Sequence, residues 1–168
     1  MINNLINILK SNQLEEIYLG GILDNDDKEF IVNKNFVYFQ FGNSYIEVEA
    51  IESYSKLKIS ITNCISYKNF VEDEVDGKIK ISEFVLLNPL AENRGVKEIS
   101  FCNLEDREDV LITDTLLLGL SNEEYIFIDP GFLGINLGGL EQKKFWEDNQ
   151  IDKNKLQISN IKINSTLY

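Results

Sequence analysis

The sequence predicts an α+β protein that is mostly antiparallel β-sheet, with a short helix at the N-terminus and another near the C-terminus. Three observations predict this class. Segments of alternating apolar and polar residues fill most of the chain, helical periodicity is confined to its two ends, and strands do not alternate regularly with helices. The chain shows no linker, composition break or repeat, so we expect one domain over residues 1–168.

The N-terminal helix is indicated by apolar residues at i, i+3, i+4 and i+7, which share one helix face. These residues are Ile2, Leu5, Ile6 and Leu9. We expect the helix to end near Ser11. A strand over residues 15–23 follows, and its Gly20–Gly21 pair indicates a bulge or a bend. Residues 24–29 are a polar turn, and residues 30–35 contain a short strand.

The clearest local pattern is a β-hairpin within residues 36–51. Its two strands flank Gly42–Asn43, a pair that tolerates the positive φ of a two-residue turn. Tyr38 and Gln40 should lie on the face opposite Val37, Phe39 and Phe41. Residues 56–62 continue the antiparallel sheet, because apolar and polar residues alternate there.

Further strands are expected at residues 78–87, 96–104, 109–120, 124–129 and 156–164, and a short helix at 140–150. The two prolines, Pro89 and Pro130, fall at strand ends, where a missing N–H costs least. Residues 128–139, which join the strand expected at 124–129 to the helix expected at 140–150, hold four glycines. A phosphate-binding loop would need Lys and Ser/Thr after Gly139, but Leu140 and Glu141 stand there. We interpret this stretch as two turns that lead into the helix, and we expect no nucleotide or other cofactor.

The charge of the chain limits its partners. Lys and Arg number 16 and Asp and Glu 28, which gives a net charge of −12. Such a field repels nucleic acid and anionic membranes and speeds encounter with a basic protein. The first residues lack the basic region of a signal peptide, and no apolar run approaches the ~20 residues of a membrane span. We therefore expect a cytoplasmic protein.

Catalytic side chains are scarce. The chain contains no histidine, the usual proton-transfer group at neutral pH. Cys64 and Cys102 lie in apolar contexts without a CxxC spacing, so we expect two small buried residues rather than a disulfide or a metal site. We expect no catalytic residues. A hydrolase that uses two carboxylates remains an alternative, with its acids in residues 24–29 or 103–114.

Residues 72–84 admit two interpretations. The spacing is similar to that of an EF-hand loop, which would take calcium ligands from Glu72, Glu74, Asp76 and Glu83, with Gly77 at loop position 6 and Ile79 at loop position 8. The sequence also fits a β-hairpin that turns at Asp76–Gly77 and places Asp73 opposite Lys80. We favour the hairpin and expect no metal site. A β-rich module that binds a small ligand or calcium, without catalytic activity, remains the alternative function.

Two stretches, "YFQFGNSYIEVEAIESYSKLKISI" and "FIDPGFLGINLGGLEQKKFW", together with the small acidic format, resemble bacterial immunity proteins of polymorphic and contact-dependent toxin systems. The resemblance implies a cytoplasmic protein that binds and neutralises a toxin domain, often a basic nuclease. Acidic residues would then speed association, and aromatic residues would slow dissociation. Charge alone gives these expected contact residues: Asp24, Asp26, Asp27, Glu72, Asp73, Glu74, Asp76, Glu105, Asp106, Glu108 and Asp109.

Overall fold

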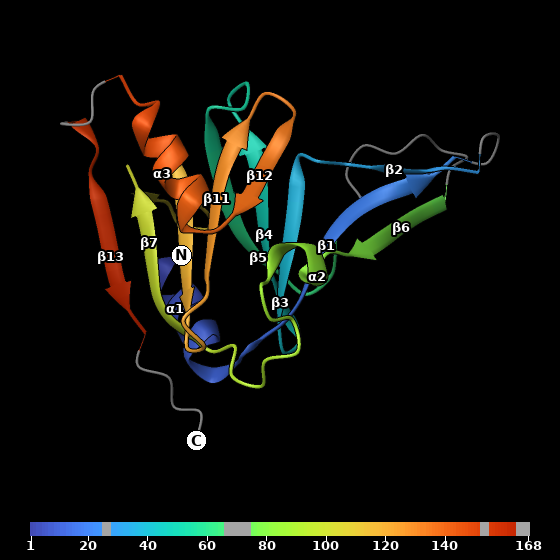
Figure 1. Cartoon of the computed structure of the whole chain (residues 1–168), viewed down its shortest axis with the longest axis horizontal. Coiled ribbons are helices and arrows are strands. Elements are labelled where there is room, and N and C mark those ends of the chain that lie inside the picture. The colour runs from blue at the N-terminus through green and yellow to red at the C-terminus, as the bar shows by residue number, and fades with distance from the viewer. Residues whose placement is uncertain (25–27, 66–74, 152–154, 164–168) are drawn as a thin grey trace.

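The computed structural model describes residues 1–24, 28–65, 75–151 and 155–163. Within these residues the chain forms two antiparallel sheets, of eight and five strands, with a helix close to each end. The two sheets face each other across a shared apolar core (Figure 1). The predicted α+β class, with mostly antiparallel sheet, is confirmed.

The eight-stranded sheet is built mainly from the first half of the chain. Its neighbours run β2-β1-β3-β4-β5-β9-β8, and β6 pairs with β1 outside this path. The strands are β1 (Leu14–Leu23), β2 (Phe30–Val32), β3 (Phe36–Phe41), β4 (Ser44–Ile51), β5 (Lys56–Thr62), β6 (Val75–Lys80), β8 (Glu105–Asp106) and β9 (Leu111–Thr113). The predicted hairpin is confirmed, since Phe41 of β3 pairs with Ser44 of β4 across a Gly42–Asn43 turn in which Gly42 has φ +59°.

The five-stranded sheet has the order β12-β11-β10-β7-β13. Its strands are β7 (Val96–Cys102), β10 (Thr115–Leu120), β11 (Tyr125–Gly131), β12 (Gly134–Gly138) and β13 (Ile158–Lys162). The single strand expected over residues 109–120 is divided, because β9 and β10 belong to different sheets. Asp114 lies between them, and its N–H donates to Cys102 O at 2.9 Å. The chain therefore crosses from one sheet to the other at this residue.

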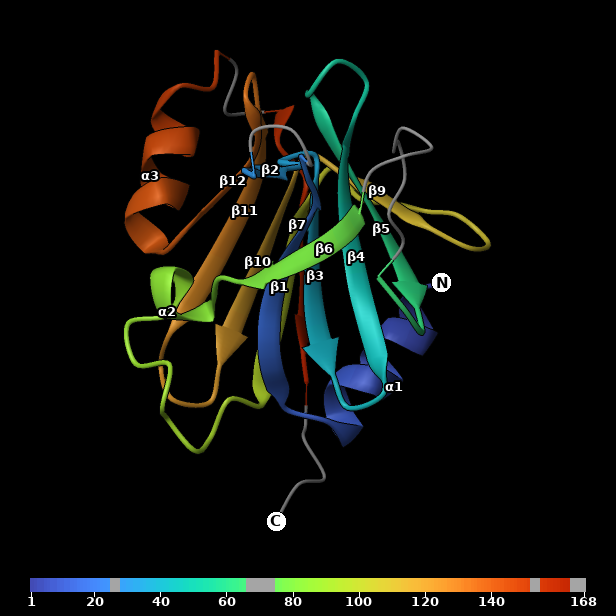
Figure 2. The same ribbon diagram turned by 90° about the vertical axis from the view of Figure 1, so that its right-hand side faces the viewer.

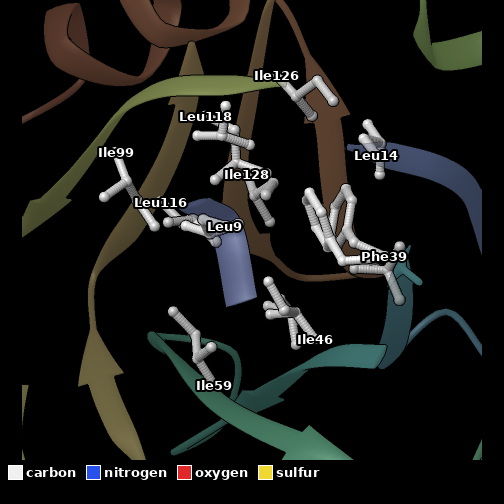
Figure 3. Packing of buried hydrophobic residues seen from close by; sticks show 14 of the residues in the cluster. Leu9, Leu14, Phe39, Ile46, Ile59, Ile99, Leu116, Leu118, Ile126 and Ile128 are labelled. Carbon is white, nitrogen blue, oxygen red and sulfur yellow. The ribbon is translucent and has the colours of Figure 1, made fainter. Parts of the chain in front are cut away.

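The three described helices are α1 (Ile2–Ser11), α2 (Ser82–Val85) and α3 (Leu140–Asp148). Helix α1 contributes Leu5 and Leu9 to the core, and both are 0% exposed. Figure 3 shows Leu9 among side chains of both sheets, including Ile59 and Leu116. Helix α3 packs on the outside of the five-stranded sheet, where the Trp146 ring lies 6.1 Å from that of Phe127. Both predicted helices are thus confirmed.

An arm of three strands leaves the body of the protein, on the right of Figure 1. It consists of β2, the second half of β1, and β6, where β1 is the central strand. Gly21 of β1 pairs with Gly77 of β6, and Phe30 covers both glycines: a Cβ atom at either position would come within 2.8 Å of the Phe30 ring. Gly20–Gly21 therefore lies where β1 leaves β3 and enters the arm, as the predicted bend requires.

The arm corrects two sequence-based expectations. The hairpin expected at Asp76–Gly77 is wrong, because β6 runs straight through both residues and pairs with β1. The strand expected over residues 78–87 ends at Lys80, and α2 follows it. Ser82 accounts for this change of direction: its hydroxyl accepts the Ile17 N–H at 2.8 Å and donates to the Glu16 carboxylate, which fixes the start of α2 on β1.

Candidate functional site

The arm carries two of the acids expected to contact a partner. Ile22 pairs with Asp76, and Leu23 pairs with Val75, so Asp24 and Asp76 lie close together at the outer end of β1 and β6. Two clusters that are about fifty residues apart in sequence are therefore joined in space. The other expected acids of these clusters, Asp26, Asp27, Glu72, Asp73 and Glu74, lie outside the described residues.

The third expected cluster lies at the opposite edge of the eight-stranded sheet, around β8. Its first two acids are engaged within the protein. Glu105 contacts Lys56 at 2.8 Å and Arg107 at 2.7 Å, and these two cations lower the pKa of its carboxyl to about 2. Asp106 contacts the N-terminal amine of Met1 at 3.3 Å. Much of the negative charge of this cluster is therefore neutralised.

Glu108 and Asp109 of the same cluster are exposed. They line an open cleft beside Asn4 and Asn7 of α1. Thr62 and Met1 also line this cleft, and Met1 carries the N-terminal amine that contacts Asp106. The structure thus separates the expected acids into an arm group and a β8 group on opposite edges of one sheet.

The calcium-loop interpretation does not fit the described part of residues 72–84. Asp76, Gly77 and Ile79 lie in a β-strand, and Glu83 lies in α2. An EF-hand needs these positions to wrap around one ion, which an extended strand does not do. Glu72 and Glu74 lie outside the described residues. Across the part of the chain that the structure describes, no three Asp, Glu or Cys side chains gather in a way that could hold a metal ion.

The glycine-rich stretch is a β-hairpin rather than two turns. Strands β11 and β12 pair from Phe127–Gly138 to Gly131–Gly134, with Phe132 and Leu133 between them. Strand β12 was not predicted, although the chain does enter helix α3 directly after Gly139. Gly134 has φ +117°, and a Cβ atom there would lie 2.4 Å from Lys34 O, so this glycine lets the hairpin approach the eight-stranded sheet.

Acidic residues that are buried, or whose pKa is shifted, form hydrogen bonds or ion pairs within the protein. Asp129 is 4% exposed and accepts hydrogen bonds from Asn136 and Gln142, each at 3.0 Å. Burial acts to raise the pKa of Glu16, but its hydrogen bond to Ser82 and its ion pair with Lys80 lower it overall. A two-carboxylate hydrolase needs one carboxyl whose pKa is raised. The pKa values of Glu16 and Glu105 are shifted in the opposite direction.

The two cysteines differ from each other. Cys102 is 1% exposed, as expected, and burial raises the pKa of its thiol to about 11. A thiol with so high a pKa is protonated at neutral pH and is a poor nucleophile. Cys64 is exposed, so the expectation that it would be buried is wrong. Its position after the end of β5 accounts for this, because the chain there has left the sheet.

A groove of about 380 Å³ lies between α2 and the start of α3. Figure 2 shows these two helices one above the other on the same side of the protein. The groove is lined by Val85 and Leu87, by residues 123–125 at the start of β11, and by residues 139–141 at the start of α3. Three segments that are far apart in the sequence therefore meet at this surface.

The groove has an acidic rim. Three of its lining residues are glutamates, and none is Lys or Arg. Glu123 contacts Lys97 at 2.7 Å, and this hydrogen bond raises the pKa of the lysine. Glu124 accepts the Asn88 N–H at 2.7 Å through Oε1, whereas its buried Oε2 accepts no hydrogen bond from the described residues. Glu141 is exposed in the first turn of α3.

The segment beside the groove, residues 84–90, exposes large apolar side chains. Phe84, Leu87 and Leu90 are 88%, 94% and 90% exposed, although they lie within seven residues of one another. Leu86 points the other way and is 5% exposed. This surface could not be predicted from the sequence, because residues 78–87 were expected to form a strand. In a strand, every second apolar side chain would face the core of the protein. The acids that complete the groove come from elsewhere in the chain and carry no local signal.

No protein-family model, curated protein or solved structure matches this chain. Among the described residues, no helix combines the length and the apolar character that crossing a membrane requires. The arrangement of exposed apolar side chains beside carboxylates at the groove suits the binding of a protein that carries both apolar and basic residues.

Proposed function

We propose that this chain is a non-catalytic acidic protein that acts in the cytoplasm and binds and neutralises a basic protein. In this it would resemble the immunity proteins of bacterial toxin systems, which bind a cognate toxin domain. The partner is a folded basic domain rather than a nucleic acid, a membrane or a small molecule.

One observation carries the proposal: Leu87, which is 94% exposed, lines a groove whose charged lining residues are all acidic, and the same segment also exposes Phe84 and Leu90. An exposed apolar side chain in a groove with a polar rim is typical of protein-binding sites. The net charge of −12 supports a basic partner, because opposite net charges raise the rate of encounter.

In this proposal the partner is inhibited because this chain covers its functional surface. Long-range attraction would bring the partner to the acidic protein, and apolar contacts would hold it there and cover the partner's own charged surface. Since a nuclease binds its substrate through Lys and Arg, an acidic protein that occupies those residues competes with the nucleic acid. No chemical step by this chain is required.

The test begins with affinity capture from the native host at low and at high salt, followed by identification of the retained proteins. Each basic candidate is then purified and titrated directly with this chain. It is also expressed in bacteria with and without this chain. The proposal expects one candidate that binds the purified chain more weakly at high salt and that arrests growth unless the chain is present.

Two outcomes would contradict the proposal. The first is that no captured protein is toxic when expressed alone. The second is that a toxic candidate binds but its activity is unchanged by a saturating amount of the chain, because binding without inhibition would exclude an immunity function.

A further inference from the structure

We infer that the groove between α2 and α3 is the surface that holds the partner, and that it receives a segment with large apolar side chains next to Lys or Arg. This inference rests on the proposed function and adds to it the site of contact and the chemistry of the contacting segment.

The apolar part of the groove calls for an apolar side chain. Leu87 and Leu140 line it, and they are 94% and 50% exposed. Both would lose contact with water when a large side chain enters, and burial of apolar surface is the main source of affinity in such contacts. At about 380 Å³, the groove is at the lower end of the range of ~300–1,000 Å³ for ligand pockets, so it suits a short segment rather than a whole domain.

The charged part of the groove calls for a neighbouring cation. The charged residues that line the groove are Glu123, Glu124 and Glu141, and of these Glu141 is exposed at the start of α3. Glu141 forms no ion pair with the described residues. A Lys or Arg side chain of the partner would pair with the exposed Glu141 carboxylate, and the groove itself contributes no basic residue that would repel it.

The two other acidic regions fit a basic partner less well. At β8, Lys56, Arg107 and the N-terminal amine already occupy Glu105 and Asp106, and Met1, which carries that amine, also lines the cleft beside Glu108 and Asp109. On the arm, β6 carries Lys78 and Lys80 beside Asp76. A second copy of this chain is disfavoured as the occupant, because each copy carries a net charge of −12.

The experiment uses a defined probe and the whole chain. The probe is a synthetic peptide, GKRLFKRG, titrated into ¹⁵N-labelled protein, with GKRAAKRG and GEELFEEG as control peptides. We expect saturable chemical-shift changes at Leu87, Tyr125 and Leu140. We also expect binding to weaken by about tenfold or more when the apolar pair is replaced by alanine, as for a central contact residue, and to disappear when the charges are reversed.

Two pairs of matched variants assign the site. Glu141→Lys in the groove and Glu108→Lys at the β8 edge change the net charge equally, and both residues are exposed. Leu87→Ser in the groove and Ile31→Ser on the arm each remove an exposed apolar side chain. The groove variants should lower the affinity for the peptide by about tenfold, and the control variants should lower it by less than about twofold. Urea denaturation of all four variants checks that their stability is unchanged.

The inference is wrong if the shift changes lie on the arm or at β8, or if both members of a pair weaken binding equally. It is also wrong if sedimentation shows a dimer that Leu87→Ser abolishes, since the groove would then hold a second copy. A toxic basic partner that binds the groove variants normally would overturn the inference and leave the proposed function intact. Peptide binding in the groove without any toxic partner would overturn the proposed function alone.

Discussion

Helices α1 and α3 are similar in length and opposite in role. Helix α1 has ten residues and places Leu5 and Leu9 in the core, whereas the nine residues of α3 include none that is buried. The N-termini of the two helices also differ: that of α1 receives a carboxylate from Asp106, while that of α3 follows Gly139 and has no side-chain cap. Helix α1 is therefore part of the folding unit, and α3 is attached to its surface.

The difference indicates which parts of the protein are free to serve binding. Because Leu9 touches side chains of both sheets, any change there disturbs the whole core. Helix α3 instead exposes Leu140 and Phe145 while its Trp146 holds it on β11. Exposed side chains of α3 can therefore be substituted with little change in the free energy of unfolding, and the start of this helix forms part of the groove.

The largest expected effect is that of Leu9→Ala. It removes a fully buried side chain from between the sheets, and we expect the free energy of unfolding to fall by about 2–5 kcal/mol. Phe145→Ala on α3, where the side chain is 66% exposed, should change it by less than about 0.5 kcal/mol. Urea denaturation of both variants measures the difference. Equal losses would mean that α3 is as much part of the core as α1.

The second largest effect is expected when the hydrogen bonds that attach α3 to β11 are removed. Asp129→Ala removes the acceptor of both the Asn136 and the Gln142 side-chain amides. We expect a loss of about 1–3 kcal/mol, because two hydrogen bonds to a charged acceptor are removed. Asp129→Asn keeps an oxygen acceptor and should lose less. Hydrogen exchange of α3 should rise in the alanine variant more than that of α1, and the reverse order would contradict the attachment.

A smaller effect is expected at the start of α1. Asp106→Asn removes the charge that faces the N-terminal amine and the Ile2 N–H, each at 3.3 Å. Contacts of this kind at an exposed helix end contribute about 0.3–1 kcal/mol. We expect a loss within that range in low salt, and a smaller loss in 1 M salt. A loss that does not depend on salt would argue against an electrostatic origin.

The smallest effect is the pH dependence that comes from Glu105. Its pKa is about 2 in the folded protein, against an ordinary value of 4.5 for a glutamate. A lowered folded pKa contributes stability above the unfolded pKa, and this contribution is lost as pH falls from about 4.5 to about 2. The difference in unfolding free energy between the wild type and Glu105→Gln should therefore be constant near neutral pH and shrink over this interval. A difference that grows as the pH falls would contradict the ion pairs.

Local patterns predicted the elements whose partners are near in the sequence. The periodicity of α1 and the Gly42–Asn43 turn both involve contacts within a few residues, so each could be read from a short window. The arm could not. Asp76–Gly77 is a strong turn signal, yet these residues pair with Ile22 and Gly21, more than fifty positions earlier. Tertiary pairing here overrides the local preference of the backbone.

The candidate site was harder to predict for a related reason. Counting acids identified Glu105 and Asp106, but their charge is neutralised by Lys56 and by the N-terminus, which are distant in the sequence. The glutamates of the groove are Glu123, Glu124 and Glu141, and none of them lies in a dense run of acidic residues. Only the fold brings them beside Leu87. Charge density along the chain therefore identified acidic residues without indicating which of them remain available.

The fixed backbone of the exposed segment has a consequence for the kinetics of binding. Leu86 N–H donates to Ser82 O, Asn88 N–H to Glu124, and Ala91 N–H to Asn88 O, so the chain around Leu87 is held at several points before any partner arrives. Little conformational entropy is left to lose on association, and rigid surfaces of this kind favour long-lived complexes. A partner held here would dissociate slowly even at salt concentrations that slow its arrival.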